Sequence, residues 1–248
     1  VQSQSVHVHD LKGEIEFRGV QMRYAKSLQP ALNDLSFSIE AGEKIAIVGR
    51  TGSGKSSLFQ LLQLFRYPSE GEIVIDGVNL RNLDASSYRS CLSVVLQQPV
   101  LLQAESLRTN LDPGDLYSDE EIKHALARAG LAEINNINSN QSLSTGQVQL
   151  MSLAGAFLNE KKGSILLLDE PTSQIDSATQ KKVLKNLFQA YKNCTVFMIA
   201  HRLETAVTYS DRVLVLDHGH IMEFQPALKL LVKNIEDTYL SNTESELG

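Results

Sequence analysis

The chain has 248 residues, of which 42% are hydrophobic, and a formal net charge of −6 at pH 7. This length can bury a substantial core, as one large domain or as two small ones. The acidic balance argues against a nucleic-acid-binding surface, and no apolar run approaches the roughly 20 residues needed to span a bilayer. Cys91 and Cys194 lie in apolar stretches typical of reduced core residues and a cytosolic setting. No signal peptide, internal repeat or low-complexity tract is expected.

Residues 1–12 are polar and are predicted to form a flexible lead-in to the folded chain. His7 and His9 could form a metal-binding pair, but no further ligands cluster nearby, which favours the lead-in. Alternating polar and apolar residues then predict half-exposed antiparallel strands over 14–20 and 35–39, ahead of a buried strand.

Further elements follow from apolar runs and capping residues. Strands are predicted over 44–48, 72–75, 93–96, 165–168, 195–200, 212–216 and 221–224. Helices are predicted from Ser57, from the N-cap Ser118 to Gly130, and over 146–158, 177–191 and 226–237. The weak strand signal between Gln97 and Ser144 predicts an all-helical insertion, and the polar end of the chain over 241–248 is expected to fray.

One glycine-rich stretch between a predicted strand and a predicted helix matches the phosphate-binding pattern G-x-x-x-x-G-K-[ST] at every fixed position. Its glycines let successive backbone N–H groups point into one concavity, to which the helix N-terminus adds a positive dipole. Lys55 supplies a charge for the outer phosphates, and the Ser56 hydroxyl is a ligand for Mg²⁺. The residues of the motif are Gly49, Arg50, Thr51, Gly52, Ser53, Gly54, Lys55 and Ser56.

The motif and the strand pattern together predict an α/β fold of the P-loop NTPase class. We expect a mostly parallel core sheet, an N-terminal antiparallel β subdomain and an all-helical insertion. The predicted nucleotide-binding core with its β subdomain covers 13–96 and 160–240, and the helical subdomain covers 97–159.

Polar side chains follow three further core strands. Gln97, Asp169-Glu170 and His201 each stand at a strand end, where ligands collect in open parallel sheets. Asp169 can hold Mg²⁺, and Glu170 can polarise a water toward the γ-phosphorus of a nucleotide. Alone, Asp169-Glu170 could be a surface turn and His201 a structural histidine, but beside a phosphate loop the catalytic interpretation is favoured.

Residues 143–147, Leu-Ser-Thr-Gly-Gln, resemble the LSGGQ signature of ABC-type ATPases, with Thr145 replacing a glycine. Together with the phosphate loop and the strand-end residues in this order, the chain resembles an ABC transporter nucleotide-binding domain along nearly its full length. The resemblance implies that Gln97 links Mg²⁺ and the attacking water to membrane domains, and that Asp176 lies in a loop touching a partner domain. The residues that it implies for nucleotide contact, beyond the motif above, are Tyr24, Ser57, Ser144, Gly146 and Gln147. An ordinary exposed aromatic remains the alternative for Tyr24.

Four further segments narrow this resemblance to one subfamily, namely 106–113, 117–122, 194–196 and 199–203. They are similar to the second nucleotide-binding domain of C-subfamily, multidrug-resistance-protein-like exporters.

Three departures from the family pattern stand out. The family usually has basic residues where this chain has Val148 and Gly155, and a glycine inside a helix costs about 1 kcal/mol relative to alanine. The segment between Gly130 and Leu143 is also shorter, through a natural deletion, an engineered one or a loop missing from the chain.

The resemblance implies an ATP-binding, Mg²⁺-dependent ATPase domain at the cytoplasmic face of a membrane. It implies a head-to-tail dimer with a second nucleotide-binding domain, coupled to transmembrane domains and powering export, with no nucleic-acid partner. Two other functions stay open: a soluble ABC ATPase of DNA repair or translation, and a regulatory nucleotide sensor with little turnover. The first would need a basic face or a coiled-coil or zinc insertion, none of which the sequence displays.

Overall fold

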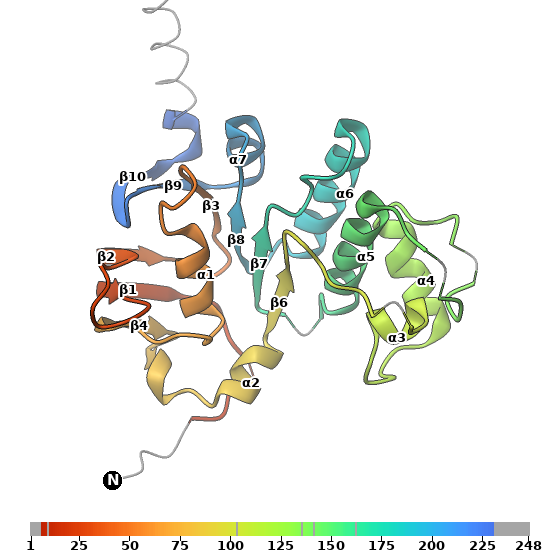
Figure 1. The fold of residues 1–248 in the computed structure, drawn as a ribbon, viewed down its shortest axis with the longest axis horizontal. Coiled ribbons are helices and arrows are strands. Elements are labelled where there is room, and N and C mark those ends of the chain that lie inside the picture. Colours follow the sequence, from red (N-terminus) through yellow and green to blue (C-terminus); the bar gives the residue numbers. More distant parts are fainter. Residues whose placement is uncertain are drawn as a thin grey trace, which may run out of the picture.

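The computed structural model describes residues 6–8, 10–102, 104–134, 136–140, 142–161 and 163–230. Within these residues the strands form two sheets (Figure 1). An antiparallel sheet has the order β2-β1-β4-β5, and a six-stranded sheet has the order β10-β9-β3-β8-β7-β6. All neighbours in the larger sheet are parallel except β9 and β10. The predicted mixture of an antiparallel subdomain and a mostly parallel core sheet is therefore confirmed.

The bounds of the elements are as follows. The antiparallel sheet contains β1 (Ile15–Met22), β2 (Leu32–Ile39), β4 (Glu70–Ile75) and β5 (Val78–Asn79). The larger sheet contains β3 (Lys44–Val48), β6 (Leu92–Val95), β7 (Ile165–Asp169), β8 (Thr195–Ile199), β9 (Arg212–Asp217) and β10 (His220–Pro226). The helices are α1 (Lys55–Leu62), a 3-10 turn (Leu80–Asn82), α2 (Ala85–Ser90), α3 (Leu107–Leu111), α4 (Asp119–Arg128), α5 (Thr145–Leu158), α6 (Ser177–Ala190) and α7 (Leu203–Tyr209).

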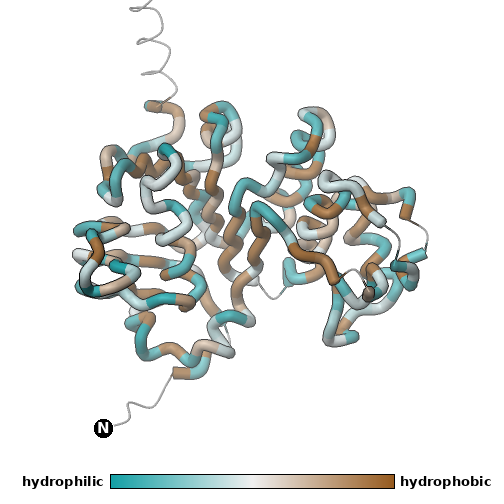
Figure 2. The backbone as a smooth tube through the Cα atoms, in the orientation of Figure 1, coloured by the Kyte–Doolittle hydropathy of each residue, from teal (hydrophilic) through white to brown (hydrophobic). Residues whose placement is uncertain are grey.

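Two hydrophobic cores lie on the two faces of the parallel sheet, because successive side chains of a strand point to opposite faces. One core joins the sheet to α1 and the antiparallel sheet. The other joins it to α4, α5 and α6. The hydropathy colouring of Figure 2 shows the apolar residues concentrated along the central strands between these layers. The layered arrangement leaves the carboxyl ends of the parallel strands free to carry polar groups.

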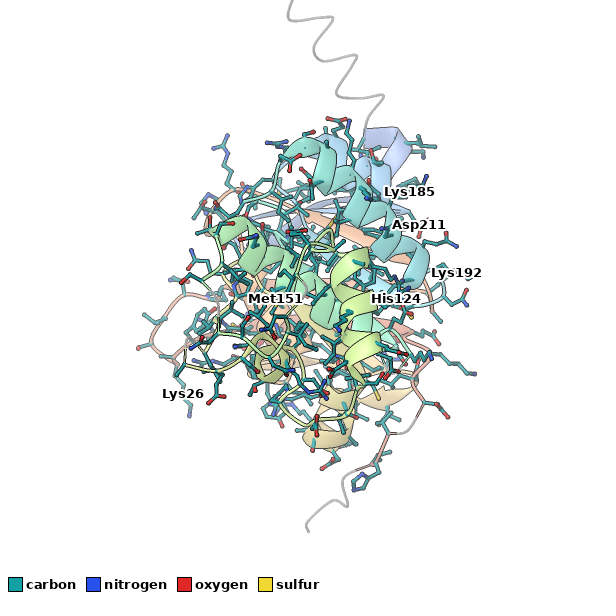
Figure 3. The ribbon with its side chains drawn as sticks, turned by 90° about the vertical axis from the view of Figure 1, so that its right-hand side faces the viewer. Lys26, His124, Met151, Lys185, Lys192 and Asp211 are labelled. Atoms are coloured by element: carbon teal, nitrogen blue, oxygen red, sulfur yellow. The ribbon has the colours of Figure 1, made fainter. Side chains whose placement is uncertain are left out.

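The helices α3, α4 and α5 form one end of the molecule (Figure 1). Figure 3 looks onto this end, where His124 marks α4 and Met151 marks α5. The N-cap Ser118 accepts a hydrogen bond from the Glu121 backbone, and the Glu121 carboxylate in return accepts one from Ser118 N–H. The predicted helix after Ser118 is thus confirmed, and no strand occurs between Gln97 and Ser144 among the residues that the structure describes there.

Two features differ from the predictions. The closing helix predicted from Pro226 does not begin there, because Pro226 is the last residue of β10 and pairs with Arg212 of β9. Helical backbone begins one residue later and runs over 227–230, where the described residues end, and the remainder of that prediction lies outside them. The short helices α2, α3 and α7 were not predicted.

Parts of the segment predicted as a lead-in contact the folded chain. Val6 forms a parallel bridge with Leu83, and the Asp76 carboxylate accepts hydrogen bonds from the backbone of Lys12, Gly13 and Glu14. His9 and the tail over 241–248 lie outside the described residues. The proposed domain boundaries stay predictions.

Candidate nucleotide site

The phosphate-binding motif forms the loop between β3 and α1. Its tight course requires glycine. A Cβ on Gly49 would lie 2.2 Å from the carbonyl oxygen of Leu216, and one on Gly54, where φ is +107°, would lie 2.8 Å from the carbonyl oxygen of Ala31. Between them lie Arg50, Thr51, Gly52 and Ser53. The backbone can therefore turn back on itself and present the N-terminus of α1 at its open side.

Lys55 is the first residue of α1 and is buried. Its Nζ donates to the carbonyl oxygens of Gly49 at 2.6 Å and Arg50 at 2.9 Å. Burial lowers the pKa of Lys55, whereas the negative charges of Glu170 and Asp169 oppose this shift. The ammonium group thus lies between the loop and the acidic strand end, where an incoming polyphosphate would meet it.

The two serines after Lys55 have different environments. Ser56 is exposed at the start of α1, whereas Ser57 is buried and its Oγ lies 3.0 Å from the Tyr24 hydroxyl. Tyr24 keeps 41% of its surface exposed, and the guanidinium of Arg66 stands 5.2 Å from its ring centre. The structure therefore joins Tyr24 to the start of α1 through Ser57 and leaves Tyr24 partly exposed.

Three strand ends converge on Glu170. This residue follows β7, and its carboxylate accepts a hydrogen bond of 2.7 Å from Gln97 Nε2, which follows β6. Its other oxygen contacts His201 Nε2, which follows β8. The convergence arises because β6, β7 and β8 are parallel neighbours, so that their carboxyl ends meet. The structure thus brings the three predicted residues into direct contact.

Asp169 ends β7 beside this cluster. Burial and, next, the negative charge of Glu170 raise the pKa of Asp169, while Lys55 and His201 oppose the shift. No group of three or more His, Cys, Asp and Glu side chains able to hold a metal occurs in the described part of the chain. A cation here would therefore need the Ser56 hydroxyl and the Gln97 amide in addition to Asp169.

The signature-like residues lie at the start of α5. Ser144 is the N-cap and accepts from Gln147 N–H, while Gln147 Oε1 accepts from Ser144 N–H at 2.9 Å. Thr145 is the first residue of the helix, and Gly146 follows it. None of these residues hydrogen-bonds to the Glu170 cluster within the described ranges. Their polar groups are used to begin the helix, and none of them hydrogen-bonds to the phosphate loop among the described residues.

Sequence reasoning missed Gln149, which is 1% exposed. Its side-chain amide donates to the carbonyl oxygen of Glu170 at 3.1 Å and so joins α5 to the acidic strand end. The only signal in the sequence is a glutamine between apolar residues of a helix. Asp176, expected in a loop that touches a partner domain, caps α6 by accepting from the N–H groups of Ala178 and Thr179.

A family model described as ABC transporter matches residues 32–173. The chain belongs to the ABC transporter family. Curated relatives include "ATP-binding cassette sub-family C member 3" of Mus musculus, 40% identical over 233 residues. "ABC transporter C family member 9" of Arabidopsis thaliana is 39% identical over 244 residues. The alignments cover 89% and 94% of this chain but only 15% and 16% of those proteins. The resemblance to C-subfamily nucleotide-binding domains is therefore confirmed.

Among solved structures of ABC proteins, a bacterial Atm1-family ABC exporter with ATP bound superposes with a TM-score of 0.85 and 31% sequence identity. The match covers 94% of this chain and 42% of that chain. This match supports the P-loop NTPase fold and agrees with the family match. In the described residues no helix has both the length and the apolar character required to cross a bilayer.

Proposed function

We propose that this chain hydrolyses Mg²⁺-bound ATP and thereby powers export by a membrane transporter. The observation that carries the proposal is the convergence of Gln97 and His201 on Glu170, beside the phosphate loop that holds Lys55. Phosphoryl transfer needs charge neutralisation, an in-line water and a group that orients or deprotonates that water. The chain supplies a candidate for each requirement at one edge of the sheet.

The phosphate loop binds the nucleotide in this proposal. The N–H groups of residues 49–56 cradle the phosphates, and the Lys55 ammonium neutralises the outer ones. Tyr24 stacks on adenine, with its hydroxyl kept in place by Ser57. Each contact uses a group that the loop or its neighbour already orients.

The proposed magnesium ligands are Ser56, Gln97 and Asp169. All three offer oxygen atoms, which hard cations prefer. A nearby cation would also stabilise the ionised form of Asp169, whose pKa burial raises. When bound, Mg²⁺ would neutralise charge on the phosphate oxygens.

Glu170 is the proposed general base. Gln97 donates to one carboxylate oxygen and His201 contacts the other, so the carboxylate is fixed in direction. From that position it accepts a proton from the attacking water, while His201 remains near the γ-phosphate. A fixed direction matters because a general base works only within hydrogen-bond reach of the proton that it takes.

The partners in this proposal are a second nucleotide-binding domain and transmembrane domains, at the cytoplasmic face of a membrane. Ser144, Gly146 and Gln147 lie at the N-terminus of α5 and make no hydrogen bond to this chain's phosphate loop among the described residues, which fits a role toward the partner's nucleotide. ATP then bridges two domains, and loss of the γ-phosphate contacts loosens the interface.

The test is steady-state ATP hydrolysis by the full-length protein that contains this chain, with Mg²⁺ and with EDTA. We expect turnover only with the cation and a loss of nucleotide binding in Lys55→Ala. Turnover that persists in EDTA would overturn the magnesium assignment. Undiminished ATP binding by Lys55→Ala would overturn the role of the loop. Absence of ATP hydrolysis by the wild-type protein would overturn the proposed function itself.

A further inference from the structure

Gln149 is a buried polar side chain of α5 that lies against the loop after β7, next to apolar residues of the same helix. It is 1% exposed, and its neighbours Leu150 and Met151 are 7% and 1% exposed. Transferring an amide into such surroundings is costly unless its donors and acceptor are paired. The hydrogen-bond partners of Gln149 therefore offset the cost of burying its amide at this position of the helix.

Among the described residues, the hydrogen-bond partners of Gln149 belong to the loop that follows β7. Its Nε2 donates to the carbonyl oxygen of Glu170 at 3.1 Å and to Ser173 Oγ at 3.2 Å. Its Oε1 accepts from the backbone N–H of Gln174 at 2.8 Å. The Gln149 side chain thus uses both the donor and the acceptor end of its amide to bind the five-residue segment that begins with Glu170.

The backbone of Glu170 is in a conformation that needs such support. Its φ is +47°, in the left-handed region that residues other than glycine rarely adopt. Residues in this region persist when their surroundings impose the conformation. The N–H of Glu170 donates to the carbonyl oxygen of Ile199 at 3.3 Å, and its own carbonyl oxygen accepts from Gln149 and from Ser173 N–H. The peptide groups on both sides of Cα are therefore fixed, and with them the direction in which the side chain leaves the backbone toward Gln97 and His201.

Close packing reinforces this connection. A Cβ on Gly146 would lie only 2.9 Å from the carbonyl oxygen of Gln174, so the first turn of α5 lies directly against the loop. The N–H of Gln174 is held by Gln149, one turn further along the same helix. Helix and loop therefore meet through two successive turns of α5.

We propose that Gln149 is a positioning residue for ATP hydrolysis, acting by holding the Glu170 backbone so that its carboxylate faces Gln97 and His201. The proposal rests on the proposed role of Glu170 as general base. Gln149 itself touches neither nucleotide nor water in this scheme. Its removal leaves the phosphate loop intact and alters the geometry of the catalytic carboxylate, so hydrolysis should fall while ATP binding is kept.

The test compares Gln149→Met with Tyr191→Phe in the full-length protein. Methionine keeps the length of glutamine without its polar atoms. Tyr191 is a matched control, because its buried hydroxyl donates to the carbonyl oxygen of Ala156 at 2.7 Å, near the other end of α5. Gln149→Met removes three hydrogen bonds of α5, and Tyr191→Phe removes the bonds of its hydroxyl to Ala156 of α5 and to Ser93, but only the first variant reaches Glu170.

We expect Gln149→Met to lower kcat by about 10- to 100-fold, the size of effect that a small misplacement of a catalytic group produces. KM for ATP should change by less than about twofold, because the contacts that bind ATP equally in the ground state and in the transition state are unchanged. Tyr191→Phe should keep the wild-type kcat, although its Tm should fall as the Tm of Gln149→Met does. In a Glu170→Gln background, adding Gln149→Met should cause no further loss of hydrolysis. A wild-type kcat for Gln149→Met, or an equal loss of kcat in Tyr191→Phe, would overturn the proposal.

A second measurement keeps the inference testable if the wild-type protein proves not to hydrolyse ATP, a result that would overturn the proposed function separately. Amide hydrogen exchange reports local opening of the loop. Gln149→Met should speed exchange at the Ser173 and Gln174 amides by about tenfold or more, while Tyr191→Phe should leave it unchanged. Equal protection of these amides in wild type and Gln149→Met would show that Gln149 does not hold the loop.

Discussion

Replacing Glu170 with glutamine tests the centre of the site with little change in shape. The wild-type carboxylate pairs with Gln97 through one oxygen and with His201 through the other. A glutamine can still accept from Gln97 with its Oε1 and donate to a neutral His201 ring with its Nε2. The variant should therefore fold normally, and the loss of a proton acceptor becomes the main effect.

The expected magnitude follows from the role of the group. A positioned general base contributes about 10²- to 10⁴-fold in rate, which is about 3–5 kcal/mol of transition-state stabilisation. Binding should change in the other direction. The charge of Glu170 acts on Lys55, where it opposes the lowering of the pKa that burial causes, so this carboxylate also lies close enough to repel the phosphates. Without it, ATP should bind as tightly as in wild type or more tightly.

The assay pairs fluorescent-nucleotide binding with steady-state phosphate release in the full-length protein. Glu120→Gln is the control, because Glu120 is an exposed carboxylate of α4 away from the site. The control should match wild type in both measurements. Full turnover in Glu170→Gln would refute the assignment of this residue, and a parallel loss of binding and turnover would refute the separation of their roles.

Three further outcomes concern stability. Gly155→Ala should raise the free energy of unfolding by about 0.5–1 kcal/mol in urea titration, because a Cβ at this helical position meets no atom within 4 Å. Tyr88→Phe should lower it by about 1–3 kcal/mol, because the fully buried hydroxyl donates to the carbonyl oxygen of Leu62 at the end of α1; no change would rule out that bond. Asp84 caps α2, and the Ser87 N–H lowers its pKa from 3.8. Its stabilisation is therefore complete above pH 3.8 and is lost as pH falls through the lowered value. Thermal unfolding should show Asp84→Ala below wild type at pH 7, with the gap closing in acid.

Much of the fold could be predicted because its strongest signals are local. The apolar runs of β7 and β8 mark buried parallel strands, and Ser118 with its acidic first turn marks the start of α4. The helices α2, α3 and α7 escaped prediction because each has only five to seven residues, which is too short for a helical period to stand out.

The candidate site divides in the same way. The phosphate loop could be predicted from the spacing of its motif, and Asp169 and Glu170 from their position at the end of an apolar strand. The role of Gln149 is not visible, because its partners lie 21 to 25 residues further along the chain. Only the folded packing of α5 on the loop brings them together, and the left-handed backbone of Glu170 likewise has no sequence pattern of its own.

The alternation of side chains along β7 has a consequence for how this site can evolve. Ile165 and Leu167 face one core, whereas Leu166 and Leu168 face the other, and Asp169 comes next. A one-residue insertion or deletion within this strand would exchange the residues of both cores and shift the carboxylates at its end. Selection for a packed interior therefore also preserves the position of Asp169 and Glu170 at the end of the strand. Insertions and deletions within β7 should be excluded even at positions where a substitution would be tolerated.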